Sequence, residues 1–126
     1  DAPAVARLRA AGAVIIGKTT TSEYGWSAAT LSRTAPPTAN PYAPHLTAGG
    51  SSGGAAAAVA TQLGEGALAT DGAGSIRIPA AFCGVAGYKP SYGRVPYVPN
   101  GVDRLAHQGT LARTVTDAAA LAAVIA

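Results

Sequence analysis

Glycine and proline divide this chain into short segments, and they limit the length of any helix or strand that it can form. Sixteen glycines and nine prolines fall among its 126 residues. Apolar periodicity and alanine content predict three helices, over residues 3–11, 55–63 and 114–125. Short apolar stretches predict three buried strands, over residues 14–16, 68–70 and 86–89. Helices that alternate with short buried strands predict an α/β fold.

The composition suits the interior of a larger protein. Hydrophobic residues make up 48% of the chain and charged residues only 12%, whereas a small independent domain usually carries a more charged surface. The first residues already belong to a predicted helix, and the chain ends inside or just after another one. We therefore expect residues 1–126 to form a single, incomplete domain that is a fragment of a larger one.

Charge and cysteine content disfavour several functional classes. The net charge is only +3, and the nine basic residues are scattered along the chain, so direct nucleic-acid binding is not expected. No stretch approaches ~20 consecutive apolar residues, so no membrane-spanning helix is predicted. Cys83 is the only cysteine, and we expect a packed thiol in a reducing, cytoplasmic compartment. The residues give no indication of a cofactor or a metal ion.

One short motif imitates a nucleotide-binding site. Residues 12–19 (GAVIIGKT) match the phosphate-loop pattern GxxxxGK[ST]. That loop normally follows a strand and opens a helix, and its backbone amides turn towards the phosphates. Here the four middle residues are themselves the predicted strand, and their Val and Ile side chains resist such a bent conformation. A nucleotide-binding module at residues 12–19 is therefore a remote alternative.

A second motif is typical of serine hydrolases that use a histidine base. Residues 49–53 (GGSSG) match the nucleophile-elbow pattern GxSxG, in which a strand delivers the serine. Pro44 lies where that strand should run, which weakens the match. His45 and His107 are the only histidines, and Asp103 precedes His107 by four residues. A Ser-His-Asp hydrolase is thus a second alternative, although a structural role explains His107 more simply.

Three further blocks occur together along the chain. They are residues 17–19 (GKT), 49–54 (GGSSGG) and 70–79 (TDGAGSIRIP). Lys18 and Ser51 are 33 residues apart, and Ser51 and Ser75 are 24 apart. In these blocks the chain closely resembles the amidase signature family. The resemblance extends over nearly the whole chain through residues 82–84 (FCG), 87–90 (GYKP) and 112–117 (ARTVTD).

The resemblance implies an amidase signature core, a mixed sheet covered by helices, and an activity that cleaves carboxamide C–N bonds. Ser75 would be the nucleophile that forms an acyl-enzyme, Ser51 the bridging serine and Lys18 the base. Such a relay is chemically reasonable, because Ser51 can accept the proton of Ser75 while it donates its own to Lys18. The relay requires an uncharged lysine, and burial disfavours the charged ammonium. Lys18 follows a predicted apolar strand, which we expect to carry it into the interior.

The resemblance also implies two backbone features. The peptide bond between Gly50 and Ser51 is expected to be cis. The turn before the nucleophile is expected to form an oxyanion hole from the backbone amides of Gly72, Ala73, Gly74 and Ser75. The family usually has glycine where this chain has Ala73, and a positive φ at that position would cost an alanine about 1 kcal/mol.

Residues beside these blocks have structural interpretations. Asp71 and Arg77 flank the nucleophile, and we expect them to pair and hold the turn. Ser52 is expected to hydrogen-bond at the start of the following helix. Three aromatic residues either line a pocket or pack within their loops: Tyr24, Trp26 and Tyr42.

Two functions compete within the family. One is a stand-alone amidase that acts on small amides. The other is the A-type subunit of an amidotransferase, which releases ammonia for tRNA-dependent amidation. Residues 93–97 (GRVPY) and 105–107 (LAH) look more like stand-alone amidases. The substrate stays open, as does the oligomeric state, for which a homodimer is one option.

Overall fold

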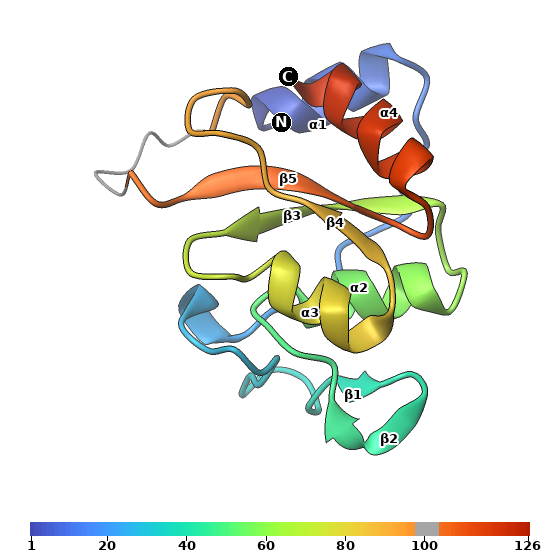
Figure 1. Cartoon of the computed structure of the whole chain (residues 1–126), viewed down its shortest axis with the longest axis vertical. Coiled ribbons are helices and arrows are strands. Elements are labelled where there is room, and N and C mark those ends of the chain that lie inside the picture. Colours follow the sequence, from blue (N-terminus) through green and yellow to red (C-terminus); the bar gives the residue numbers. More distant parts are fainter. Residues whose placement is uncertain (98–103) are drawn as a thin grey trace.

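The structure is a computed structural model that describes residues 1–97 and 104–126. Asp103, the acid of the Ser-His-Asp alternative, lies outside the described residues. Helices and strands alternate along the chain (Figure 1). In chain order they are α1 (Pro3–Ala10), the 3-10 turn η1 (Glu23–Gly25), β1 (Ala39–Asn40), β2 (Ala43–Thr47), α2 (Gly53–Ala60), β3 (Gly66–Asp71), α3 (Arg77–Cys83), β4 (Ala86–Tyr88), β5 (His107–Ala112) and α4 (Val115–Ile125).

A three-stranded sheet forms the centre of the protein. Its order is β3-β5-β4, and β5 pairs antiparallel with both neighbours. The pairing of β3 with β5 runs from Gly66 opposite Ala112 to Asp71 opposite His107. A smaller hairpin of β1 and β2 lies at the opposite end of the molecule from α1 and α4 (Figure 1). The predicted α/β class is confirmed.

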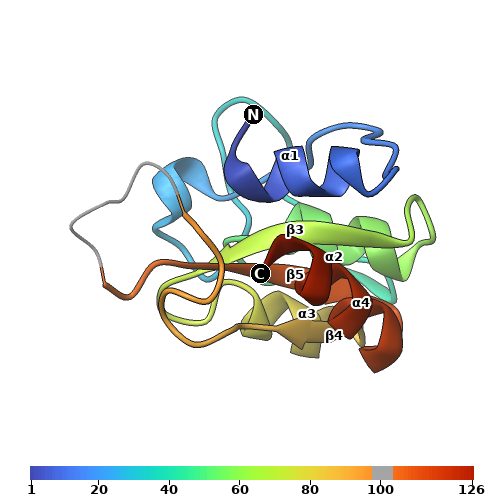
Figure 2. The same ribbon diagram turned by 90° about the horizontal axis from the view of Figure 1, so that it is seen from above.

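Helices cover both faces of the central sheet. Helices α2 and α3 lie on one face, and α1 and α4 lie on the other (Figures 1 and 2). On the first side, Ala69 and Leu111 pack in a cluster with residues of α2 and α3. On the second side, Leu68 packs against a cluster that includes Leu8 and Ile125. Because neighbouring residues of a strand point to opposite faces, β3 contributes to both cores.

Local sequence signals account for the outer helices. Pro3 opens α1. A backbone N–H at this first helical position would have no acceptor within the helix, so proline loses no hydrogen bond there. Gly12 follows that helix with φ +87°, a conformation that favours glycine. At the start of α4, the Thr114 hydroxyl accepts a hydrogen bond from the Asp117 amide over 3.1 Å, as predicted for a cap. These helices are therefore confirmed near their predicted bounds.

The predicted strand over residues 14–16 is wrong. These residues form no strand, and Val14, Ile15 and Ile16 are 84%, 41% and 75% exposed. A strand needs a neighbour to receive its backbone hydrogen bonds. None of the strands within residues 1–97 and 104–126 pairs with this segment. Apolar, β-branched composition alone therefore did not decide its structure.

Five elements were not predicted: the turn η1, the strands β1, β2 and β5, and the helix α3. Helix α3 begins at Arg77, two residues after Ser75, although Pro79 lies inside it. Strand β5 was not predicted from its composition, yet it is the central strand of the sheet. Strand β2 contains Pro44, which is compatible with an edge strand. Each element depends on contacts with distant parts of the chain.

Among the described residues, no helix is long and apolar enough to cross a lipid bilayer. In the same part of the chain, no three His, Cys, Asp or Glu side chains gather closely enough to hold a metal ion.

Candidate active site

Ser51 lies in a tight loop that leads into α2. The peptide bond between Gly50 and Ser51 is cis, which confirms the expectation. A Cβ atom at residue 50 would lie 2.7 Å from the carbonyl oxygen of Ser27. Only glycine fits there, because real side chains do not approach a backbone oxygen so closely. Ser51 itself is 4% exposed, so its loop is part of the packed interior.

Thr30 holds this loop from the other side. Its hydroxyl donates to the carbonyl of Gly49 over 2.8 Å and accepts from the amide of Gly53 over 2.9 Å. Thr30 is 2% exposed, so both bonds are sheltered from water. The amide of Ser22 also donates to the carbonyl of Ser51 over 3.2 Å. Thr30 and Ser22 were not predicted from the sequence, because neither belongs to a motif or a periodic pattern.

The turn that carries Ser75 is organised by Asp71 at the end of β3. The fully buried Asp71 carboxylate accepts hydrogen bonds from the amides of Gly74, Ile76 and Arg77 at 2.8, 3.1 and 3.3 Å. Nε and Nη2 of Arg77 donate to its two oxygens at 3.0 and 2.9 Å. The predicted pairing of Asp71 with Arg77 is therefore confirmed, and it closes the turn that carries Ser75.

This network favours the charged form of Asp71. Burial by itself raises the pKa of the carboxyl group, because it penalises the charge. The hydrogen bonds from Arg77 and from the three amides outweigh burial and lower the Asp71 pKa to about 2. The bonded carboxylate in turn raises the pKa of Arg77. Both groups are therefore charged at neutral pH.

The loops of Ser51 and Ser75 lie against each other. The amide of Ser52 donates to the carbonyl of Ser75 over 3.2 Å. Gly25, in η1, adjoins this pair, since a Cβ atom there would lie 3.8 Å from Oγ of Ser51. Within the described part of the chain, neither the Ser51 nor the Ser75 hydroxyl has a hydrogen-bond partner. Two hydroxyls that are 24 residues apart in sequence thus lie in adjoining loops, and neither donates a hydrogen bond within the described residues.

Ser52 has a different role from the one predicted. It precedes α2, but its side chain makes no capping hydrogen bond. Its hydroxyl instead donates to the carbonyl of Thr70 over 3.3 Å and accepts from the Thr70 amide over 3.4 Å. Ser52 therefore ties the start of α2 to the end of β3, which brings the loops of Ser51 and Ser75 together.

Lys18 lies in an exposed extended segment. It has no hydrogen bond or ion pair within residues 1–97 and 104–126. The expectation that an apolar strand carries Lys18 into the interior is therefore not met in this chain. The segment is fixed just after it, where the carbonyl of Thr20 accepts from the amide of Gly54 over 3.2 Å. Lys18 thus lies two residues before Thr20, which is hydrogen-bonded to the start of α2.

The expected oxyanion amides fall into two groups. The Gly74 amide is already used by the carboxylate of Asp71. Among the described residues, the amides of Gly72, Ala73 and Ser75 have no hydrogen-bond partner. Ala73 does not have a positive φ, so the anticipated strain at this alanine is absent.

Gly74, by contrast, could not be replaced without strain. It has φ +122°, in the region that favours glycine. A Cβ atom there would lie 2.8 Å from Cδ1 of Ile78. The glycine requirement of this turn therefore lies at residue 74.

The competing motifs find little support in the structure. Residues 13–19 form no helix or strand, and the next helical turn begins at Glu23, so the phosphate-loop geometry is absent there. His107 directs Nδ1 to the backbone carbonyls of Asp71 and Leu105, in agreement with a structural role. His45 is exposed on β2.

Cys83 is a packed thiol, as predicted. It is fully buried and its Sγ donates to the carbonyl of Ala48 over 3.5 Å. Burial raises the pKa of this thiol.

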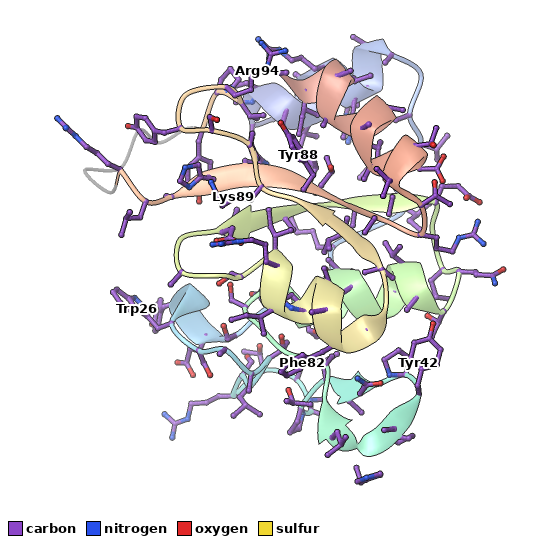
Figure 3. All side chains as sticks on the ribbon, in the orientation of Figure 1. Trp26, Tyr42, Phe82, Tyr88, Lys89 and Arg94 are labelled. Carbon is purple, nitrogen blue, oxygen red and sulfur yellow. The ribbon has the colours of Figure 1, made fainter. Side chains whose placement is uncertain are left out.

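One polar side chain near the site, that of Gln108, was not anticipated from the sequence. Gln108 is 8% exposed, and its Oε1 has no partner in the part of the chain that the structure describes. It lines a hollow of about 150 Å³ beside β3, together with Thr19, Thr21 and Ser52. Trp26, 90% exposed, projects outwards from the turn that adjoins Ser51 (Figure 3).

Comparisons with known proteins place this chain in a family. The family model described as Amidase matches residues 1–126. The A-type subunit of glutamyl-tRNA(Gln) amidotransferase from Thermus thermophilus is 46% identical over 131 residues, which cover 100% of this chain and 27% of that protein.

Two solved structures are similar in fold as well as sequence. A bacterial aryl acylamidase of the amidase signature enzymes family matches with a TM-score of 0.89 and 40% identity, over 98% of this chain and 26% of its own. The structure of 6-aminohexanoate cyclic dimer hydrolase complexed with substrate matches with a TM-score of 0.94 and 45% identity. The match covers 99% of this chain and 27% of that hydrolase. The chain spans about a quarter of the length of these relatives. It belongs to the amidase signature family.

Proposed function

We propose that the protein containing this chain hydrolyses carboxamides through an acyl-enzyme on Ser75. The observation that carries the proposal is the hydrogen bond between the Ser52 amide and the Ser75 carbonyl, which brings the loops of Ser51 and Ser75 together. Both hydroxyls are without partners among the described residues, as a nucleophile and a proton carrier require.

The proposed reaction begins with attack of Ser75 Oγ on the amide carbonyl carbon. The Ser75 proton passes to Ser51 Oγ as Ser51 passes its own proton to the uncharged amine of Lys18. The tetrahedral intermediate then collapses, the C–N bond breaks, and the leaving nitrogen takes a proton back through the same relay. Water next attacks the acyl-enzyme and releases the carboxylic acid.

The negative oxygen of the intermediate needs hydrogen-bond donors that are already in place. The amides of Gly72, Ala73 and Ser75 are available for this role. The Gly74 amide is not, because it is bonded to Asp71. We propose that Gly74 contributes through the shape of the turn rather than through its own N–H.

The position of Lys18 depends on more than this chain. Its segment is attached to the start of α2 through Thr20, two residues after Lys18. The relatives are about four times as long. We propose that parts of the longer protein cover the exposed Val14 and Ile16 and thereby remove the Lys18 amine from water, which favours its uncharged form.

The proposal is tested by fluorophosphonate treatment of the full-length protein, with mass spectrometry to locate the modified residue. Labelling is expected on Ser75, and Ser75→Ala should abolish both labelling and hydrolysis. Ser91→Ala, an exposed serine outside the site, serves as the matched control and should change neither. Labelling that survives Ser75→Ala would point to Ser51 and to the elbow alternative.

The Lys18 assignment has its own test. Lys18→Ala should lower turnover while leaving the fold intact, since Lys18 makes no contact on which the described structure depends. Turnover that stays near the wild-type value after Lys18 is replaced by alanine would argue against a lysine base.

An amidotransferase component is the second candidate, favoured by the similarity to the Thermus thermophilus protein. Both candidates use the same hydrolytic step. A stand-alone amidase should release ammonia from small amides without a partner. An amidotransferase component should co-purify with partner subunits and should act on glutamine or asparagine in a tRNA-dependent reaction.

A further inference from the structure

His107 lies directly beside the turn that holds the nucleophile. It begins β5 and stands opposite Asp71, the last residue of β3, in the antiparallel register. The chain leaves the sheet immediately after Asp71 and enters residues 72–75. The segment before His107 also adjoins this turn, since a Cβ atom at Gly72 would lie 3.9 Å from the carbonyl oxygen of Leu105.

The ring of His107 is held in one orientation. Its Nδ1 lies 3.2 Å from the carbonyl oxygen of Asp71 and also contacts the carbonyl oxygen of Leu105. Because both neighbours accept hydrogen bonds only, Nδ1 must carry the hydrogen. Tyr92 packs against the ring edge to face, with centroids 5.9 Å apart and planes at 83°. The imidazole is therefore held with its Nδ1–H shared between two carbonyl oxygens, that of Leu105 at 2.5 Å and that of Asp71 at 3.2 Å.

Asp71 is thus restrained at two points. Its carboxylate gathers the amides of Gly74, Ile76 and Arg77. Its backbone carbonyl is engaged by His107. That carbonyl belongs to the same planar peptide group as the N–H of Gly72.

The planarity of this group links His107 to the site. The bond between Asp71 and Gly72 is trans, because the one cis bond in the described chain lies between Gly50 and Ser51. In a trans peptide the C=O and the N–H point in opposite directions. A donor that fixes the direction of the Asp71 carbonyl therefore also fixes the direction of the Gly72 amide.

We propose that His107 is a positioning residue that orients the peptide group between Asp71 and Gly72, so that the Gly72 amide is aimed at the oxyanion formed when Ser75 attacks. This inference rests on the proposed function. His107 itself transfers no proton to the substrate and acts only through Asp71 and Gly72.

The test uses three variants of the full-length protein. His107→Leu keeps bulk and removes the donor. His107→Asn places an amide N–H at about the position of Nδ1, and His45→Leu changes the other histidine of this chain, which is exposed on β2. For His107→Leu we expect kcat for a carboxamide to fall about 10–100-fold, with KM changed less than about threefold, as for a misdirected oxyanion donor. His107→Asn should recover most of kcat, and His45→Leu should leave it unchanged.

A purely structural role of His107 would not lower kcat while KM stays nearly constant, and it would not let asparagine restore kcat. The proposal is overturned if His107→Leu retains kcat within about twofold, or if His107→Asn folds and loses as much kcat as His107→Leu. If His107→Leu does not fold, His107→Asn decides alone: near wild-type kcat supports the proposal, and a large loss overturns it. Ser75→Ala is assayed in parallel. Turnover that survives this change contradicts the proposed function itself, whereas the His107 variants test only the inference about His107.

Discussion

Arg77 binds both oxygens of the Asp71 carboxylate, through Nε at 3.0 Å and Nη2 at 2.9 Å. Asp71 is fully buried, whereas the Arg77 side chain is 56% exposed. The pair therefore joins the interior of the turn that carries Ser75 to its surface. Three backbone amides complete the coordination of the carboxylate, so removal of its charge should loosen the whole turn.

Asp71→Asn should destabilise the protein strongly. The new amide NH₂ would face donors from Arg77 and from the turn, which leaves buried groups without acceptors. We expect the free energy of unfolding to fall by about 3 kcal/mol, measured as the urea midpoint at neutral pH. Asp117→Asn, at the exposed start of α4, is the matched control and should cost less than about 1 kcal/mol. Equal losses in the two variants would contradict the role given to Asp71.

Acid should weaken the same turn at a defined pH. The Asp71 pKa is lowered from 3.8 to about 2 in the folded protein. Because the pKa is lowered on folding, the charged carboxylate stabilises the fold at every pH above the ordinary pKa of the group. This stabilisation is lost as pH falls from about 4 towards 2. Urea titrations of the wild type should show a steep loss of stability in this window. In Asp71→Asn the loss over the same window should be shallower, and an identical slope would argue against Asp71 as its source.

Thr30→Val should disturb the Ser51 loop. Valine has nearly the shape of threonine but cannot serve the Gly49 carbonyl or the Gly53 amide, which the hydroxyl now joins. Two buried backbone groups would lose their partner, at a cost of about 2 kcal/mol in unfolding free energy. Turnover should fall as well, because the same loop carries Ser51.

Thr30→Ser is the matched control, since it restores the hydroxyl and removes only a methyl group. Urea midpoints and kcat for both variants provide the comparison. If serine and valine behave alike, packing of the methyl group rather than the hydroxyl holds this loop.

Ala73→Gly should bring no gain in activity. The family usually has glycine at this position, but Ala73 has no positive φ in this structure, so glycine relieves no strain. Glycine also increases the freedom of the unfolded chain, which should lower stability by about 0.4–1 kcal/mol. Steady-state kinetics and thermal unfolding measure the two effects. A several-fold rise in kcat for Ala73→Gly would show that alanine does distort the oxyanion turn.

Local patterns were sufficient for several parts of this protein. The helices at both ends of the chain follow from proline at the first helical position of α1, glycine after it, and the Thr114 cap of α4. The strands around residues 68–70 and 86–88 follow from short apolar runs between glycines. The resemblance in the serine and lysine blocks led to the cis bond before Ser51. The opposite charges that flank Ser75 led to the pairing of Asp71 with Arg77.

Tertiary contacts decided the rest, because a strand or a buried hydroxyl is defined by what lies beside it. Residues 14–16 have strand composition, yet with no partner strand among the described residues they stay exposed. Residues 107–112 lack such a composition, yet they form the central strand because β3 and β4 supply hydrogen bonds on both sides. Thr30 and His107 contact the site across 19 and 36 residues of sequence. No pattern within a short window encodes such contacts, since the free energy that fixes them comes from groups that only folding brings together.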